Sequence, residues 1–104
     1  MKQIYLASPF FNDTELVVYK ETISRLRNAG YKVHVPQEHE IKNAWDYSNA
    51  DWARMVFDMD VDALRVSDVV MVLNFGMYSD SGTAWEAGFA AALEIPVIQV
   101  LCGF

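Results

Sequence analysis

Apolar and polar positions along this chain follow two different patterns. Short apolar runs, which predict buried strands, separate longer stretches in which apolar residues recur every three or four positions, the spacing of an amphipathic helix. Strands are expected at 3–7, 31–35, 69–75 and 97–101, and helices at 12–30, 51–68 and about 81–94. Because strands and helices alternate, the chain is expected to adopt an α/β fold, a doubly wound parallel sheet with helices on both faces.

Capping and breaking residues sharpen several boundaries. Asn12 or Asp13 is the expected N-cap of the first helix, and Gly30 is expected to end it. Pro36 follows the alternating run at 31–35, which places this short strand near a sheet edge.

The second helix carries an acid in an unusual place. On a helical wheel, Trp52, Val56, Met59 and Ala63 form its apolar face, and Asp60 lies at the border of that face. A carboxylate there is costly unless it is paired, hydrogen-bonded or protonated. Asp60 is therefore a candidate proton donor. The alternative is an acid at the rim of the face that reaches solvent.

The segment "YSDSGTAWEAGFAAA" (78–92) gathers acids and glycines around the predicted start of the third helix. Two interpretations of Glu86 are open. With Thr83 as N-cap, Glu86 is the acidic member of a capping box. In the other interpretation, Asp80 and Gly82 belong to a turn that lets the backbone approach a ligand closely, and Glu86 faces that ligand.

Position in the fold favours a functional role for this segment. In doubly wound sheets, ligands bind beyond the C-terminal strand ends, at the point where the strand order reverses. The segments 5–11 and 74–82 are expected on that edge. Ser8 and Phe10 follow the first strand without the glycine-rich cradle and lysine of a phosphate loop, so the sequence does not indicate nucleoside triphosphate chemistry.

Composition narrows the compartment and the partners. A single domain is expected over 1–104. Its 53% hydrophobic content suggests apolar surface hidden in a subunit interface, although a tightly buried sheet would give a similar composition. The net charge of −6 argues against a nucleic-acid polymer or an anionic membrane as partner. Cys102 has no second cysteine to pair with, and the apolar run at 4–7 is too short for a signal peptide or a membrane span, so a cytoplasmic protein is expected. His34 and His39 lack partners at metal-ligand spacing, and no metal site is expected.

Three motifs resemble those of one family, the nucleoside 2-deoxyribosyltransferases. They are "IYLASPFFN" (4–12), the pattern "D-x-x-x-[LI]-x-x-[SA]-D" as Asp60 to Asp68 before an apolar strand, and "DSGTAWEAGFA" (80–90). Together they cover the chain from end to end in the family's order. The third motif is specific, whereas the other two would be weak alone.

The resemblance implies roles for individual residues. Glu86 falls on the family's nucleophile, which attacks the anomeric carbon of deoxyribose, and Tyr5 falls on the tyrosine that orients that glutamate. Asp60 falls on the aspartate associated with the nucleobase and its protonation, and Asp80 on the aspartate that holds the sugar near its 5′-hydroxyl. The other expected substrate-binding residues are Gly82, Ser8 and Phe10.

The activity that the resemblance implies is exchange of nucleobases between 2′-deoxyribonucleosides through a deoxyribosyl-glutamate intermediate. It implies free nucleobases as second substrates, no cofactor and a homo-oligomer. Family members usually continue beyond the strand at 97–101 with a segment that completes a neighbouring subunit's site, and this sequence lacks that segment. One alternative is an N-glycoside hydrolase of 2′-deoxynucleoside 5′-monophosphates, although Asp80 would repel the phosphate. The alternative from another class is a nucleoside- or nucleotide-binding module without catalysis.

Overall fold

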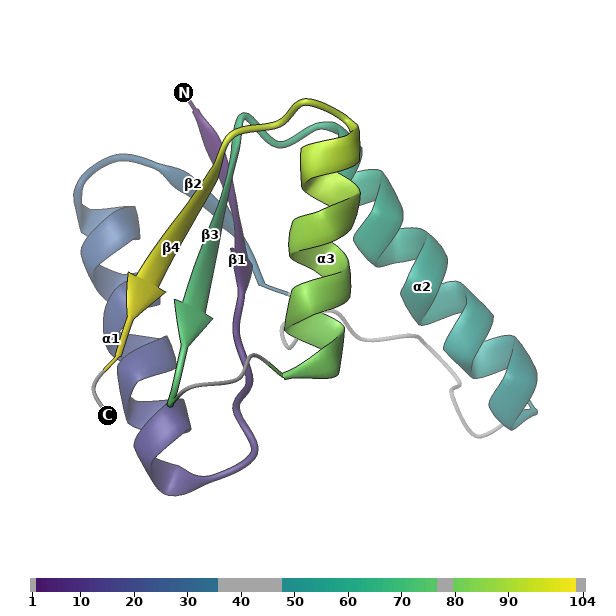
Figure 1. Cartoon of the computed structure of the whole chain (residues 1–104), viewed down its shortest axis with the longest axis horizontal. Coiled ribbons are helices and arrows are strands. Elements are labelled where there is room, and N and C mark those ends of the chain that lie inside the picture. The colour runs from purple at the N-terminus through teal and green to yellow at the C-terminus, as the bar shows by residue number, and fades with distance from the viewer. Residues whose placement is uncertain (1, 36–47, 77–79, 103–104) are drawn as a thin grey trace.

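The computed structural model describes residues 2–35, 48–76 and 80–102. Every predicted strand and helix is present, in the predicted order (Figure 1). The elements are β1 (Gln3–Ala7), α1 (Asp13–Asn28), β2 (Lys32–His34), α2 (Asn49–Arg65), β3 (Val69–Asn74), α3 (Ser81–Ala92) and β4 (Val97–Leu101).

The four strands form one parallel sheet in the order β2-β1-β3-β4. Helix α1 covers one face of the sheet, and α2 and α3 lie together on the other (Figure 1). The doubly wound fold class is therefore confirmed, and β2 is an edge strand as expected. The chain moves outward from β1 to β2 and then returns to β3 on the other side of β1, so the strand order reverses between β1 and β3. This is the point at which a doubly wound sheet binds its ligand.

The core has two halves because side chains alternate across β1. Leu6 joins a buried cluster with Tyr19 on the α1 side, whereas Tyr5 and Ala7 join a cluster with Leu64 on the α2–α3 side. A strand buried on both faces has a continuous apolar run, which is why β1 shows no alternation in the sequence. The same geometry directs the Tyr5 side chain toward α3.

The ends of α1 follow the predicted signals. The side chain of Asn12 accepts a hydrogen bond of 2.9 Å from the backbone N–H of Glu15, so Asn12 is the N-cap. Gly30, just past the last helical turn, has φ of +96°, a conformation that glycine adopts without steric cost.

The predicted apolar face of α2 was partly right. Val56, Met59 and Ala63 are half-buried and Ala63 packs against the core, but the fully buried residues of this helix are Val61 and Leu64, and Trp52 is 46% exposed. The helix begins earlier than expected, at Asn49, where the hydroxyl of Ser48 accepts from the backbone N–H of Asp51. Apolar residues lie on several sides of α2, so the helix position over β1 and α3 decides which side is buried.

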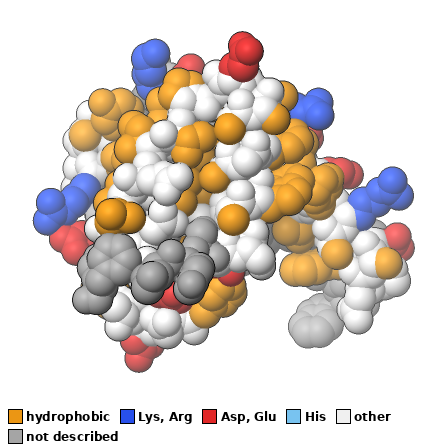
Figure 2. Space-filling model, viewed as in Figure 1, with side chains coloured by type: hydrophobic (Ala, Val, Ile, Leu, Met, Phe, Trp, Pro, Cys, Tyr) orange, Lys and Arg blue, Asp and Glu red, His pale blue; other side chains and the backbone are white. Residues whose placement is uncertain are grey.

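Large hydrophobic side chains also remain on the surface. Trp85 and Leu93 of α3 and Ile98, Val100 and Leu101 of β4 are exposed. Figure 2 shows hydrophobic side chains spread over this face of the molecule, with most of the charged ones near its outline. The expected homo-oligomer, which would cover such surface, stays a prediction.

Candidate active site

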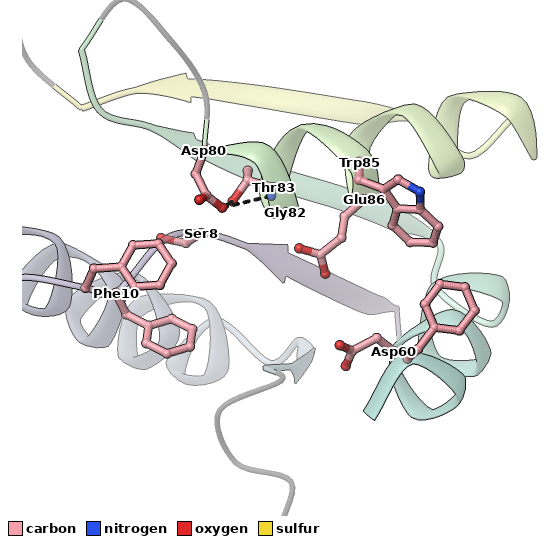
Figure 3. Close-up of a pocket in the computed structure, with 10 residues that line it drawn as sticks. Ser8, Phe10, Asp60, Asp80, Gly82, Thr83, Trp85 and Glu86 are labelled. Carbon is pink, nitrogen blue, oxygen red and sulfur yellow. Dashed lines mark hydrogen bonds between the residues drawn. The ribbon is translucent and has the colours of Figure 1, made fainter. Parts of the chain in front are cut away.

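A pocket of about 280 Å³ opens at the sheet edge where the strand order reverses (Figure 3). Its walls come from the segment after β1, from α2 and from the first turns of α3. All the predicted site residues except Tyr5 line it. The lining residues are Ser8, Phe10, Phe11, Phe57, Asp60, Asp80, Gly82, Thr83, Trp85 and Glu86.

Tyr5 lies beneath the pocket and joins it through Glu86. The tyrosine is fully buried in β1, and its hydroxyl donates a hydrogen bond to Oε2 of Glu86. Burial of the phenol and the neighbouring Glu86 carboxylate raise the pKa of Tyr5, so the hydroxyl keeps its proton and serves as a donor. The contact joins residues far apart in the sequence and fixes α3 against the centre of the sheet.

The Glu86 carboxyl is balanced between its two protonation states near neutral pH. Burial raises its pKa to about 7, the hydrogen bond from Tyr5 lowers it, and the negative charges of Asp60 and Asp80 raise it. A carboxylate that is poorly solvated and held by one donor is suited to act as a nucleophile or a base.

The capping-box interpretation of Glu86 is wrong. Asp80 is the N-cap of α3: its Oδ2 accepts from the backbone N–H of Thr83 at 3.0 Å and from the Thr83 hydroxyl at 3.2 Å. The helix therefore starts at Ser81, and Glu86 lies beyond its first turn. Asp80 precedes Thr83 in the chain that leaves β3, and its side chain caps the free backbone N–H groups at the start of the helix. Glu86 points instead into the pocket (Figure 3).

Gly82 and Ser8, two of the predicted substrate-binding residues, form part of the pocket wall. A Cβ added at Gly82 would meet Oδ2 of Asp80 at 3.4 Å, an ordinary contact, so the fold alone tolerates a side chain there. The hydroxyl of Ser8 donates to the backbone oxygen of Pro9 at 2.8 Å. Roles for Gly82 and Ser8 in substrate binding remain predictions.

Asp60 belongs to the packed side of α2 and not to a solvated rim. Its side chain is 21% exposed, and Oδ1 lies 3.8 Å from Nε2 of His34. Asp60 and Glu86 reach the pocket from α2 and α3 respectively (Figure 3). With Asp80, the site therefore presents three carboxyl groups to one cavity.

Sequence reasoning missed two aromatic walls of the pocket. Phe57 and Trp85 pack with ring centroids 5.3 Å apart, and both are about half exposed. Phe57 lies three residues before Asp60 and so shares its side of the helix, a spacing that could have identified it. Opposite them, Phe10 stacks on Tyr19 with centroids 5.3 Å apart.

Cys102 lies outside the pocket. Cys102 packs against the core cluster on the α1 side, and burial raises the pKa of its thiol. Within 2–35, 48–76 and 80–102, no three His, Cys, Asp or Glu side chains are grouped to hold a metal. His39 lies outside the described residues. No helix in the described part of the chain has the length and apolar character needed to cross a membrane.

The fold and the pocket together define a doubly wound α/β protein with three carboxyl groups gathered in one pocket at its topological switch point. The chain belongs to the nucleoside 2-deoxyribosyltransferase family, whose family model matches residues 4–102. This family consists of N-glycosyl transferases.

Individual relatives agree with this assignment. A 2-deoxyribosyltransferase from Bacillus psychrosaccharolyticus is 32% identical, with a TM-score of 0.83 over 95% of this chain and 72% of its own. A nucleoside deoxyribosyltransferase from Limosilactobacillus fermentum is 26% identical over 92% of this chain, which spans 62% of that relative's length. A CMP N-glycosidase from Clostridium botulinum, 24% identical, shares the fold with a TM-score of 0.66 over 96% of this chain and 69% of its own.

Proposed function

We propose that this protein exchanges nucleobases between 2′-deoxyribonucleosides, with Glu86 as the nucleophile. The observation that carries the proposal is the buried hydrogen bond from Tyr5 to Glu86 at the floor of a pocket that Asp60 also lines. Family membership supports the same chemistry. The pocket volume of about 280 Å³ lies just below the usual range for small-ligand sites.

Cleavage of an N-glycosidic bond needs help at both ends of the bond. In the first step, a Glu86 carboxylate oxygen forms a bond to the anomeric carbon while the bond from that carbon to the base nitrogen breaks. The electron pair of the broken bond leaves on the base, which accepts a proton from the Asp60 carboxyl. A second base then attacks the anomeric carbon, Asp60 recovers a proton from it, and Glu86 is released. This is the two-carboxyl logic of retaining glycosidases.

The partly ionised state of Glu86 agrees with this role. The pKa of about 7 leaves a substantial fraction of carboxylate at neutral pH and makes it more basic than an exposed glutamate. The Tyr5 hydroxyl holds one oxygen in place and leaves the other side of the carboxyl group toward the pocket.

Asp80 favours an uncharged nucleoside over a nucleotide. Its carboxylate caps α3 and lines the pocket at the same time. A phosphate placed beside it would meet a like charge in a partly desolvated site, whereas a sugar hydroxyl could donate to it. Hydrolysis of 5′-monophosphates is therefore the second choice, although a CMP N-glycosidase shares the fold.

Incubation with thymidine and free adenine, followed by chromatography, tests the proposal directly. We expect thymine and 2′-deoxyadenosine to form together with wild type and not with Glu86→Ala. Free thymine without deoxyadenosine would indicate hydrolysis. A melting temperature raised by deoxynucleosides without any product would instead support a binding module. Glu94→Gln, which alters an exposed glutamate just past α3, is the matched control and should keep wild-type turnover.

A further inference from the structure

His34 lies at the junction between the two halves of the site, although the proposed reaction assigns it no part. It is the last residue of β2 and the parallel-strand partner of Tyr5 on β1. The two rings stack, with centroids 5.0 Å apart and planes 22° apart. Nε2 of the same ring lies 3.8 Å from Oδ1 of Asp60, and only 11% of the His34 side chain is exposed. One imidazole therefore touches the tyrosine that holds Glu86 and approaches the other carboxyl group.

The His34 ring also borders a groove of about 640 Å³ between β2 and α2. Apolar side chains such as Met59 and Ala63 make up most of its lining, and Lys32, Asp62 and Gln3 contribute polar groups. Acidic groups reach the junction from two helices, Asp60 from α2 directly and Glu86 from α3 through Tyr5. The groove also leaves room for a side chain of different shape at position 34.

Packing alone does not explain an imidazole at this position. Phenylalanine would stack on Tyr5 equally well and would bury no polar nitrogen. A ring nitrogen facing Asp60 stabilises the carboxylate form of that residue, and a carboxylate is costly to leave uncompensated in a mostly buried place. The separation of 3.8 Å exceeds a hydrogen bond, so the stabilisation is electrostatic in this conformation.

We propose that His34 is a positioning residue that orients the Asp60 carboxyl and stabilises the carboxylate left after Asp60 has protonated the departing base. The inference rests on the proposed function. When the bond from the anomeric carbon to the base breaks, the electron pair goes to the base, the Asp60 proton follows it, and a negative charge remains on Asp60. An N–H at Nε2 of His34 faces that new charge. The same ring stacks on Tyr5, which donates to Glu86.

Two variants distinguish the contribution of the His34 ring nitrogen from that of the stacked ring. His34→Phe keeps the stacking on Tyr5 and removes the N–H, whereas His34→Gln places an amide N–H near the position of Nε2 and loses the stacking. Kinetics are compared for thymidine and for 5-fluoro-2′-deoxyuridine, whose base leaves more readily and needs less protonation. With thymidine, we expect His34→Phe to lower kcat about tenfold with KM nearly unchanged, and His34→Gln to retain most of the wild-type kcat. With the fluorinated substrate, the loss in His34→Phe should shrink to about threefold or less.

Equal losses of kcat for both substrates, or a His34→Gln variant as impaired as His34→Phe, would show a merely structural role and overturn the inference. A double-mutant cycle of urea unfolding with His34→Phe and Asp60→Asn tests the contact without any need for turnover. Non-additive losses of stability support it, and additive losses refute it. An inactive wild type would count against the proposed function, while this cycle would still decide whether His34 acts on Asp60.

Discussion

Replacing Glu86 by glutamine should make the protein inactive and, at alkaline pH, more stable. Burial is the main cause of the raised pKa of Glu86, which is about 7 in the fold against 4.5 in a free chain. The folded state therefore binds the Glu86 proton more tightly than the unfolded chain does. The stability that this proton contributes is fully present below pH 4.5 and is lost as the pH rises through 7. Glutamine keeps the shape of the side chain and an acceptor for Tyr5 but removes the charge.

The size of the effect follows from the same pKa values. The difference between 4.5 and about 7 corresponds to at most roughly 3 kcal/mol between the protonated and ionised forms. Solvent near the pocket screens part of this, and the hydrogen bond from Tyr5 to a neutral amide is weaker than to a carboxylate, so a gain of about 1–2 kcal/mol at pH 8 is expected. For a domain of this length, each kcal/mol raises the melting temperature by about 4–8 °C.

Urea unfolding of wild type and Glu86→Gln at pH 4.5 and pH 8 measures this difference. The gain should be present at pH 8 and nearly absent at pH 4.5. Glu94→Gln makes the same chemical change at an exposed position and should show no such pH-dependent gain. If Glu86→Gln were less stable than wild type at pH 8, the carboxylate would be stabilising the fold. The assignment of Glu86 as a poorly solvated nucleophile would then be wrong.

Two further predictions concern the neighbours of Glu86. Tyr5→Phe removes the hydrogen-bond donor that lowers the pKa of Glu86. The acid limb of the pH profile of kcat/KM should therefore move upward by about one pH unit, with most activity regained at high pH. If the acid limb did not move, the Tyr5 hydroxyl would have no part in the reaction. Asp80→Ser keeps an N-cap while removing the negative charge, so stability should change little and the kcat/KM ratio of monophosphate to nucleoside should rise. Asp80→Ala, the control, should cost about 1 kcal/mol of stability through loss of the cap, and a wild type that already prefers the monophosphate would contradict the charge argument.

The order and type of every element could be predicted because the relevant signals are local. Asn12 and Gly30 mark the ends of α1 through their own backbone preferences, and β1 is recognisable from its continuous apolar run. The place of the site followed from the same local signals, since the parallel alternation implies where strand ends meet.

The buried face of α2 and the choice between the two interpretations of Glu86 were both decided by tertiary structure. Helix α2 has apolar residues on several sides, and its crossing over the sheet buries Val61 and Leu64 in preference to Trp52. At α3, Asp80 and Thr83 are both good N-caps, and the path of the chain from β3 gives the position to Asp80. No periodicity in the sequence distinguishes such alternatives.

The three acids of the site look alike in the sequence and differ in the structure through their partners. Asp80 accepts hydrogen bonds from Thr83, so its charge is used to start a helix. Burial leaves the Glu86 carboxylate poorly solvated, and the Tyr5 hydroxyl donates a hydrogen bond to it. Asp60 faces the imidazole of His34 across a gap wider than a hydrogen bond. Removal of one charge is therefore expected to have three different consequences: a lost or replaced cap at Asp80, a gain in stability with loss of the proposed nucleophile at Glu86, and loss of the proposed proton donor at Asp60. Because α3 carries both the cap and Glu86, the start of the helix at Asp80 fixes where Glu86 meets Tyr5. The capping acid thus positions the proposed nucleophile, whatever contact it makes with a substrate.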